Sequence, residues 1–343
     1  MTGALKVVTP GLQTTVQDLG RWGQQRLGLP VAGALDPVAL RLANALVGNP
    51  QGAAGLEVRF AGPTLEVEAD EVLVALTGAL EGRLEDDPPA VLRPWRSWRL
   101  HRGQRVRIAC AGGAVGCLAV GGGFALAPVA ESLATYARAG LGGLAGRALQ
   151  AGDLLPLAGG ADGRRELELA RPPAADEGPI RAVAGPQADY FTDEALAAFT
   201  EATWTVSSEA DRMGLRLEGP ALRHKGAADI ISDGIATGCI QVPANGQPIL
   251  LMVDRQTVGG YPKIATVASV DLPRVGRLKP GDRLRFAMVE VAEAQAARRA
   301  AERRLMALAA DLVPAAPLGR IDAARLLDAN LISGVVDSLE GPP

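Results

Sequence analysis

The chain has 343 residues, enough for one large domain or two medium ones. Its 35 basic and 38 acidic side chains give a formal net charge of −3, so it lacks the basic excess of nucleic-acid-binding proteins. Cys110, Cys117 and Cys239 form no C-x-x-C pair, and no apolar segment follows the N-terminus. We therefore expect a cytoplasmic protein with neither a disulfide framework nor a zinc knuckle.

The first helix is predicted by its boundary residues. Asp36-Pro37 is typical of an N-cap followed by proline at the first helical position, and Gly48 with Asn49-Pro50 ends the helix. Arg41 and Asn44, three positions apart, would then lie together on its more polar face.

After this helix the hydrophobic period changes to two, which is typical of half-buried strands joined by short turns. Turns are expected at Gly62-Pro63 and Ala69-Asp70. The sequence therefore predicts an antiparallel β domain, with strands near residues 56–60, 65–67 and 72–76.

Residues 108–130 have the length of a membrane span, because 23 consecutive positions carry no charge. Six glycines and one proline break this stretch into short apolar pieces. It therefore predicts two buried strands and a glycine loop, and we expect no membrane association.

The second half repeats the strand-rich pattern after one helix that is expected to begin behind Thr192. Asn245-Gly246 is typical of a two-residue hairpin turn. Strands are expected at residues 204–206, 215–217, 240–242 and 249–253.

Two sequence echoes indicate that the halves are related by duplication, although generic strand–turn chemistry would produce similar runs. Residues 59–65 resemble residues 216–222, and residues 100–108 resemble residues 278–286. The resulting division places an N-terminal β domain at residues 1–165, a second β domain at 178–290, and a C-terminal helix and tail at 291–343. The helix carries a cluster of four arginines: Arg298, Arg299, Arg303 and Arg304. This cluster is either a solvated helix face or a docking surface for an acidic partner.

Several kinds of chemistry are excluded by what the sequence lacks. His101 and His224 are its only histidines, which excludes His-rich metal sites and argues against a Ser-His-Asp triad. The glycine runs 121–123 and 142–143 lack the Lys-Ser/Thr of a phosphate-binding loop. No lysine lies beside a methionine, so we expect no biotin attached to this chain.

Three polar-rich segments lie between apolar strands: residues 13–21 with 33–36, residues 207–214, and residues 241–247 with 254–263. The third combines side-chain donors with glycines that let a backbone approach a ligand closely.

These segments carry a family resemblance. The runs GLQTTVQDLGRWG, GLPVAGALDPVALRLANALVGNP, SSEADRMGLRLEGPAL and GCIQVPANGQPILLMVDRQTVGGYPK resemble the family of 5-oxoprolinase C subunits, also called KipA or allophanate hydrolase subunit 2. The family is similar to part of the carboxyltransferase domain of urea carboxylase. The resemblance covers about residues 5–290 and rests on several motifs in the right order.

The resemblance implies a mainly β protein with a few helices, built as two tandem cyclophilin-like β-barrel domains plus a C-terminal helical extension. It implies one component of a heteromeric, ATP-binding hydrolase that opens the cyclic amide 5-oxoproline to L-glutamate. The implied partners are the KipI-like B subunit and the A subunit of 5-oxoprolinase, and magnesium is expected with ATP.

The site residues follow from the same resemblance. Four residues of the third segment are expected to be catalytic: Asp254, Gln256, Tyr261 and Lys263. Six others are expected to bind substrate: Asp36, Arg41, Asn44, Arg212, Thr257 and Gln241. For Asp36 a helix N-cap, and for Arg212 a local ion pair with Asp211, are the structural alternatives. We expect all these residues to pack into one cleft.

The sequence departs from the family pattern at three places. Residues 131–135 read Glu-Ser-Leu-Ala-Thr where a Gly-Ser-Arg-Ser-Thr run is usual, Val258 replaces a common threonine, and Asp233 replaces a usual glutamate. These changes put the substrate identity in doubt, and together with the family name KipA they leave two alternatives open. One is a component of a carboxyltransferase or of an allophanate or urea-amide hydrolase, and the other is a KipA-type regulator that binds a kinase inhibitor.

Overall fold

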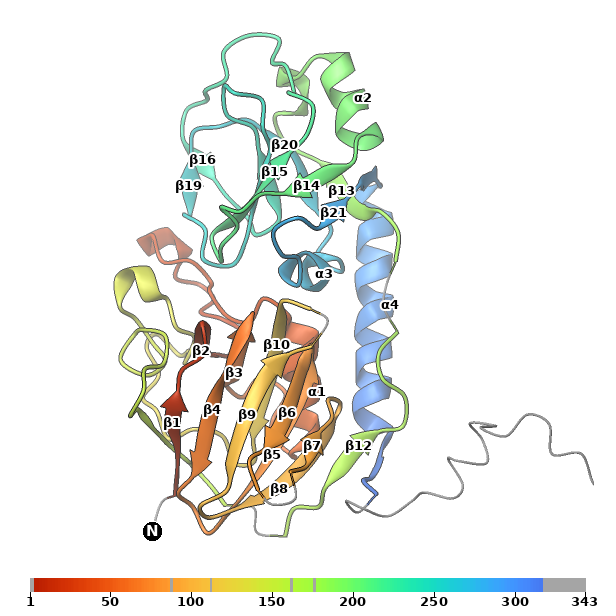
Figure 1. Ribbon diagram of the computed structural model, residues 1–343. Coiled ribbons are helices and arrows are strands. Elements are labelled where there is room, and N and C mark those ends of the chain that lie inside the picture. The colour runs from red at the N-terminus through yellow and green to blue at the C-terminus, as the bar shows by residue number, and fades with distance from the viewer. Residues whose placement is uncertain (1–2, 87–88, 112, 161–162, 175–176, 317–343) are drawn as a thin grey trace, which may run out of the picture.

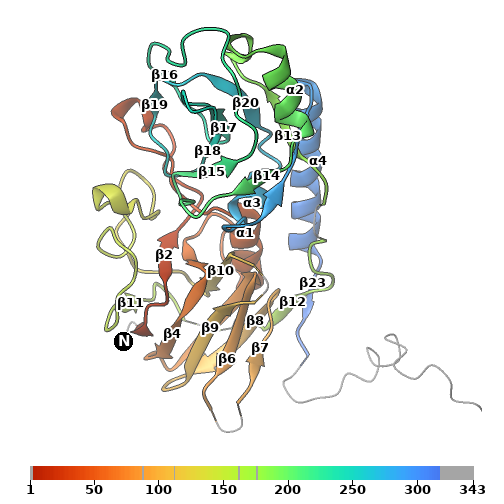
Figure 2. The ribbon, with the colours of Figure 1, turned by 45° about the horizontal axis from the view of Figure 1, so that its top comes forward.

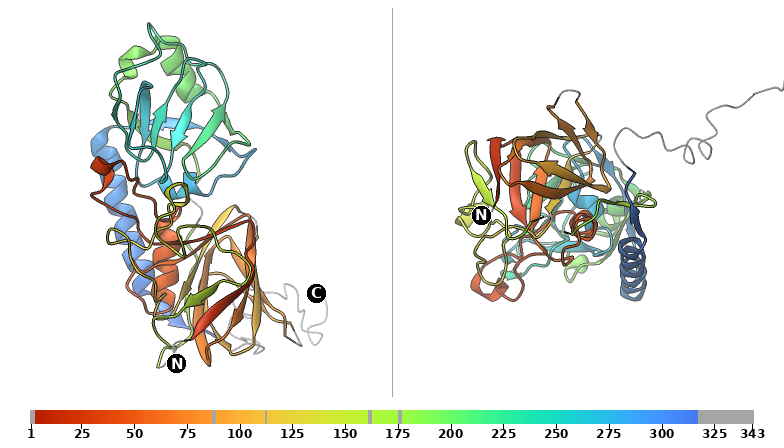
Figure 3. Two further views of the ribbon diagram at one scale, coloured as in Figure 1. Left: turned by 90° about the vertical axis from the view of Figure 1, so that its left-hand side faces the viewer. Right: turned by 90° about the horizontal axis from the view of Figure 1, so that it is seen from below.

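The computed structural model describes residues 3–86, 89–111, 113–160, 163–174 and 177–316. Two β-rich halves are stacked, with helix α3 between them and helix α4 alongside both (Figures 1 and 3). The helices are α1 (Pro37–Leu46), α2 (Asp193–Glu201), α3 (Leu272–Gly276) and α4 (Val291–Ala310), with short 3₁₀ turns η1 (Gln25–Leu27), η2 (Ala137–Ala139) and η3 (Ala188–Tyr190).

The first half is built from two sheets that enclose one core. One sheet has the order β11-β1-β4-β9-β6-β7 and the other β2-β3-β10-β5-β8-β12-β23. Their strands are β1 (Ala4–Thr9), β2 (Gln13–Gln17), β3 (Gly55–Arg59), β4 (Ala61–Val67), β5 (Glu71–Gly78), β6 (Leu80–Leu84), β7 (Val91–Leu92), β8 (Arg96–His101), β9 (Arg105–Cys110), β10 (Val115–Val120), β11 (Leu154–Pro156), β12 (Leu167–Leu169) and β23 (Leu312–Pro314).

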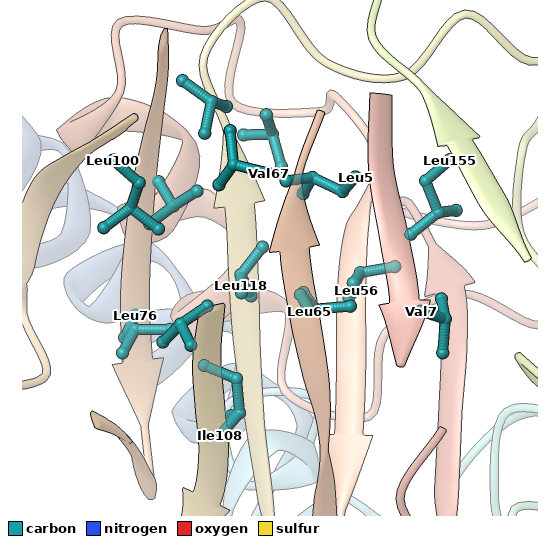
Figure 4. Close-up of a cluster of buried hydrophobic side chains, with 14 of the residues drawn as sticks. Leu5, Val7, Leu56, Leu65, Val67, Leu76, Leu100, Ile108, Leu118 and Leu155 are labelled. Atoms are coloured by element: carbon teal, nitrogen blue, oxygen red, sulfur yellow. The ribbon is translucent and has the colours of Figure 1, made fainter. Parts of the chain in front are cut away.

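Most consecutive strands cross from one sheet to the other, and inward-facing side chains of both sheets meet in the core (Figure 4). Leu56, Leu65 and Leu118 are fully buried there. Phe60, with φ +61°, makes the sharp bend between β3 and β4. The alternating apolar residues of the sequence thus face inward and form the hydrophobic core between the two sheets.

Strands β5 and β10 are buried on both faces because α1 covers their outer side. Leu40 and Ala43 of α1 pack against Ala75 and Ala119. This explains the long uncharged run around β10, which forms two strands and a glycine loop as predicted. No helix among the described residues is long and apolar enough to span a bilayer.

The second half is a nearly closed barrel. Its eight-stranded sheet has the order β21-β14-β15-β18-β17-β20-β13-β22, and the two edge strands are separated in sequence only by Arg285. Its strands are β13 (Ile180–Ala184), β14 (Trp204–Val206), β15 (Gly214–Glu218), β17 (Cys239–Gln241), β18 (Ile249–Leu251), β20 (Lys263–Val267), β21 (Arg283–Leu284) and β22 (Phe286–Met288). A separate ribbon pairs β16 (Asp233–Gly234) with β19 (Val258–Gly259).

Helix α4 lies against both halves (Figure 2). Only Leu305 of its 20 residues is buried. Arg41 of α1 forms an ion pair with Glu302, and β23, which follows α4, pairs with β12 of the first half. The helix is therefore held by this ion pair, by the strand that follows it, and by a small apolar cluster in which Leu305 packs with Leu42 and Leu169.

Most predicted elements are confirmed, including both helix starts, where Asp36 and Thr192 accept N-cap hydrogen bonds. Two turn predictions are wrong. Gly62-Pro63 lies inside β4, because the bend occurs at Phe60. The hairpin at Asn245-Gly246 is a longer loop, because β17 ends at Gln241 and β18 begins at Ile249.

Candidate functional site

The first residue of β20 is a buried lysine that reaches an exposed carboxylate. Lys263 Nζ lies 2.6 Å from Asp233 Oδ2 and 3.3 Å from the carbonyl oxygen of Gly234. Lys263 is buried, whereas the Asp233 side chain is 54% exposed. The hydrogen bond from Lys263, aided by the Gly234 N–H, lowers the pKa of Asp233, so the carboxylate stays ionised at neutral pH.

Two glutamines lie beside this ion pair. Gln256 Nε2 donates to Gln241 Oε1 at 3.5 Å, and Gln241 Nε2 donates to the carbonyl oxygen of Tyr261 at 3.3 Å. A Cβ on Gly259 would lie 2.9 Å from Gln241 Nε2, so a larger residue there would push the Gln241 side chain aside. Gln241 is buried, while Gln256 and Tyr261 are exposed. We call these residues, with Thr257, Asp233 and Lys263, the ribbon cluster.

Arg255 lies beneath the ribbon cluster. Its Nε and one terminal nitrogen donate to the carbonyl oxygen of Ile235 at 3.2 and 3.1 Å. The other terminal nitrogen has no hydrogen-bond partner among the described residues. Burial lowers the pKa of Arg255. The residue anchors the loop that carries Gln256.

Two positions before Gln256 the loop meets the first half. Arg212 donates to both carboxylate oxygens of Asp254 at 2.9 and 3.0 Å, to Glu57 Oε1 at 2.5 Å, and to the carbonyl oxygen of Gly33 at 2.8 Å. Glu57 also accepts from the Leu35 N–H at 2.6 Å. Burial by itself lowers the pKa of Arg212, but Glu57 and Asp254 together raise it above its usual value. We call Glu57, Arg212 and Asp254 the junction cluster.

The α1 residues have partners of their own. Asp36 caps the helix through the Ala39 N–H and pairs with Arg277 at 2.7 Å. Arg41 binds both carboxylate oxygens of Glu302, and Asn44 Nδ2 donates to the carbonyl oxygen of Ala53 at 2.6 Å.

The structure therefore does not bring the ten predicted residues into one group. Gln241, Gln256, Thr257, Tyr261 and Lys263 belong to the ribbon cluster. Asp254 and Arg212 belong to the junction cluster, and the α1 residues Asp36, Arg41 and Asn44 belong to neither. Asp211 does not pair with Arg212; its Oδ1 accepts from the N–H groups of Met213 and Gly214.

Sequence reasoning missed two charged groups. Glu57 stands in an alternating strand, where a polar residue usually faces solvent, and nothing marked it as buried. Asp233 stood out only as a departure from the family pattern. The roles of Glu57 and Asp233 become visible only in the structure, where they pair with Arg212 and Lys263.

A cavity of about 330 Å³ lies between the two halves, beside the junction cluster. Met252 and Val253, which precede Asp254, form part of its wall, and the Ala32 N–H donates to the carbonyl oxygen of Val253 at 3.0 Å. Arg41 and Arg298 are its charged lining residues, and most of the remaining lining is aliphatic. The junction cluster thus holds one wall of an opening between the halves.

A family model described as "Carboxyltransferase domain, subdomain A and B" matches residues 27–288. The chain belongs to this family. It is 40% identical over 310 residues to a protein of Escherichia coli K12 that is named as the C subunit of 5-oxoprolinase, covering 89% of this chain and 97% of that protein.

Solved structures agree with the carboxyltransferase fold. The crystal structure of TTHA0988 superposes with a TM-score of 0.75 at 34% identity, covering 83% of this chain and 56% of that one. The crystal structure of the Kluyveromyces lactis urea carboxylase gives a TM-score of 0.81 at 26% identity, covering 90% of this chain and 29% of that one. This chain therefore spans only part of those longer proteins.

The altered loop of this carboxyltransferase-family chain, residues 131–135, wraps around Asp18. Ser132 Oγ donates to Asp18 Oδ1 at 2.9 Å, and the Leu133 N–H donates to Asp18 Oδ2 at 2.7 Å. Arg21 donates to the carbonyl oxygens of Val129 and Ala134. Ser132 and Thr135 are buried while Glu131 is exposed, so most of the loop's polar groups face the protein, which favours a structural role for the loop.

Metal and thiol chemistry find little support within the described ranges. No three His, Cys, Asp or Glu side chains of those residues come together as a metal site. Burial raises the pKa of Cys110 to about 11 and that of Cys117 well above its usual value, so both remain thiols at neutral pH.

Proposed function

We propose that this chain is the C subunit of an ATP-dependent 5-oxoprolinase, which opens 5-oxoproline to L-glutamate together with a KipI-like B subunit and an A subunit. The observation that carries the proposal is the 40% identity to the E. coli protein of that name over 97% of its length. The free cysteines fit a cytoplasmic location.

The reaction explains why ATP takes part as a second substrate. A lactam carbonyl is resonance-stabilised and a poor electrophile. Transfer of the γ-phosphoryl group to the amide oxygen releases ADP and activates the carbon. Water then adds to that carbon and the C–N bond breaks, which leaves an acyl phosphate, and a second water hydrolyses it to the glutamate carboxylate and phosphate. Such a reaction requires orientation and charge stabilisation more than a protein nucleophile. Magnesium would enter as the counter-ion of ATP.

The ribbon cluster is the part of this chain best suited to hold the lactam. Gln256 and Tyr261 offer exposed donors, and Thr257 lies between them in the sequence. Asp233 presents an ionised carboxylate fixed by Lys263. We assign Lys263 to positioning, because its buried ammonium reaches substrate only through Asp233.

The junction cluster supports this site from behind. Asp254 is two residues from Gln256, and Arg212 ties it to Glu57 of the first half. We propose positioning roles for Asp254 and Arg212. For Asp36, Arg41 and Asn44 we propose structural roles, because their polar groups have internal partners.

The test is glutamate release from 5-oxoproline and ATP by the chain co-purified with its partners. We expect Gln256→Ala and Lys263→Met to lower kcat by roughly ten- to a hundredfold, because a small displacement of orienting groups costs that much. Gln150→Ala and Lys279→Met remove the same groups from exposed positions outside both clusters, and should leave kcat unchanged. Unaltered turnover in the Gln256 and Lys263 variants would place the site elsewhere.

A second candidate function is that of a carboxyltransferase or urea-amide hydrolase component. It is favoured by the K. lactis superposition and by 32% identity to a putative urea carboxylase of Emericella nidulans, of which this chain covers 25%. Turnover of urea or allophanate by the same complex, with no glutamate release, would establish it. A purely regulatory KipA-type role predicts an intact complex whose turnover is insensitive to Lys263→Met.

A further inference from the structure

A second cavity, also about 330 Å³, lies under α4 where α3 and the segment leading into β13 meet it. Four arginines line it: Arg181, Arg274, Arg277 and Arg304. Its volume is at the lower end of small-ligand sites, which span roughly 300–1,000 Å³. It shares five lining residues with the cavity between the halves, which form a common wall: Val38, Val270, Pro273, Ala301 and Leu305.

Three of the four arginines are held by two buried carboxylates. Arg181 Nε and Nη2 bind the two oxygens of Asp271 at 2.8 Å each, and Arg274 lies 3.2 Å from the same carboxylate. Arg277 binds Asp36 at 2.7 Å through one terminal nitrogen. These ion pairs fix the guanidinium groups in place before any ligand arrives.

The fourth arginine, Arg304, is exposed and has no hydrogen bond or ion pair among the described residues. Arg277 is 38% exposed and uses a single nitrogen on Asp36. Guanidinium groups bind oxyanions through two parallel N–H donors. Donors of both residues are therefore available at the cavity.

The rest of the wall leaves space and lowers the local dielectric constant. On α4 the lining residues Ala297, Ala300 and Ala301 have small side chains, which leave space in front of the helix. Val270 and Leu308 add apolar surface. Charge–charge attraction is stronger beside such a wall than in open solvent.

We propose that this cavity binds a small, doubly charged oxyanion, a phosphate monoester or pyrophosphate. Arg304 and Arg277 contact the anion, and Asp271 and Asp36 hold the surrounding guanidinium groups. A dianion matches the site better than a monocarboxylate, because Arg304 and Arg277 can each direct charged donors at the same anion. The proposal does not depend on 5-oxoprolinase activity and lies outside the ribbon cluster.

The test is calorimetric titration of the full-length chain at low ionic strength with pyrophosphate, with inorganic phosphate and with 5-oxoproline. We expect saturable binding of the two phosphates that weakens as salt is added. Arg304→Gln should weaken pyrophosphate binding roughly ten- to a hundredfold, the effect of losing a charge-assisted hydrogen bond. Arg303→Gln is the matched control, because Arg303 is exposed on the same helix but lines neither cavity.

A second pair of variants changes shape without changing charge. Ala297→Leu should fill the cavity and abolish binding, whereas Ala296→Leu, on the exposed face of α4, should not. Equal weakening by Arg303→Gln and Arg304→Gln would show diffuse attraction to α4 and overturn the proposal. So would binding of 5-oxoproline alone, or the absence of saturable phosphate binding.

Discussion

The junction cluster and the Lys263–Asp233 pair both centre on a buried cation, yet they differ in where the carboxylates lie. Glu57, Arg212 and Asp254 have side chains no more than 10% exposed. In the other pair only Lys263 is buried, and Asp233 reaches solvent. The junction cluster joins the two halves of the protein, whereas the Lys263–Asp233 pair presents a fixed negative charge to solvent and to any ligand.

The physical difference is in what happens when one partner is lost. Inside the junction the two carboxylates have been taken out of water, so without Arg212 they would stay buried and uncompensated. Without Lys263, Asp233 would simply be hydrated. The comparison therefore predicts a large structural effect at the junction and a small one at the ribbon.

The largest effect is expected from Arg212→Ala. Removing the cation should lower the free energy of unfolding by about 3–5 kcal/mol, because Glu57 and Asp254 remain buried without it. The measurement is urea unfolding of the isolated chain. Arg216→Ala is the matched control, since Arg216 pairs with Glu209 at the surface and should cost no more than about 1 kcal/mol. Similar losses in both variants would contradict the distinction drawn between buried and exposed pairs.

An intermediate effect is expected at Asp271, whose side chain is fully buried while Arg181 and Arg274 are 28% and 14% exposed. Burial alone would raise the pKa of Asp271. The hydrogen bonds and charges of Arg181 and Arg274 together lower it by more, so the pKa in the folded protein lies below the usual value. The stability it contributes is present above the ordinary carboxylate range near pH 4 and is lost as the pH falls through the depressed pKa.

Asp271→Asn should therefore destabilise the chain by about 1–3 kcal/mol at neutral pH, and the difference from the natural protein should shrink below about pH 4. Urea unfolding at a series of pH values measures this. Asp70→Asn, at an exposed ion pair with Arg102, should show neither the loss nor its pH dependence. A difference that grows on acidification would mean that the sign of the pKa shift is wrong.

Much of the fold could be predicted because its signals are local. Asp36-Pro37 and Thr192 mark helix starts by capping chemistry that acts within one turn. The alternation of the first strands reflects a single core. The bend at Phe60 could not be predicted, since a non-glycine residue at positive φ leaves no signal in the sequence.

The candidate site was harder to predict because its partners are distant in the sequence. Arg212 meets Glu57 across 155 positions, and Arg41 meets Glu302 across 261. Polar segments in the sequence showed which residues were unusual. They could not show whether a side chain faces a ligand or another half of the same chain.

The smallest structural effect is expected from Lys263→Met. Methionine replaces most of the apolar stem, and Asp233 gains water in place of the ammonium, so the free energy of unfolding should change no more than for an ordinary surface substitution. The pKa of Asp233, which Lys263 holds below its usual value, should rise toward that value, as an NMR titration of its carboxyl carbon would show. Lys225→Met removes an exposed partner of Asp193 and should leave Asp233 untouched. If Lys263→Met destabilised the chain as much as Arg212→Ala, Lys263 would have a structural role like that of Arg212. The assignment of the ribbon cluster as the substrate-binding surface would then be contradicted.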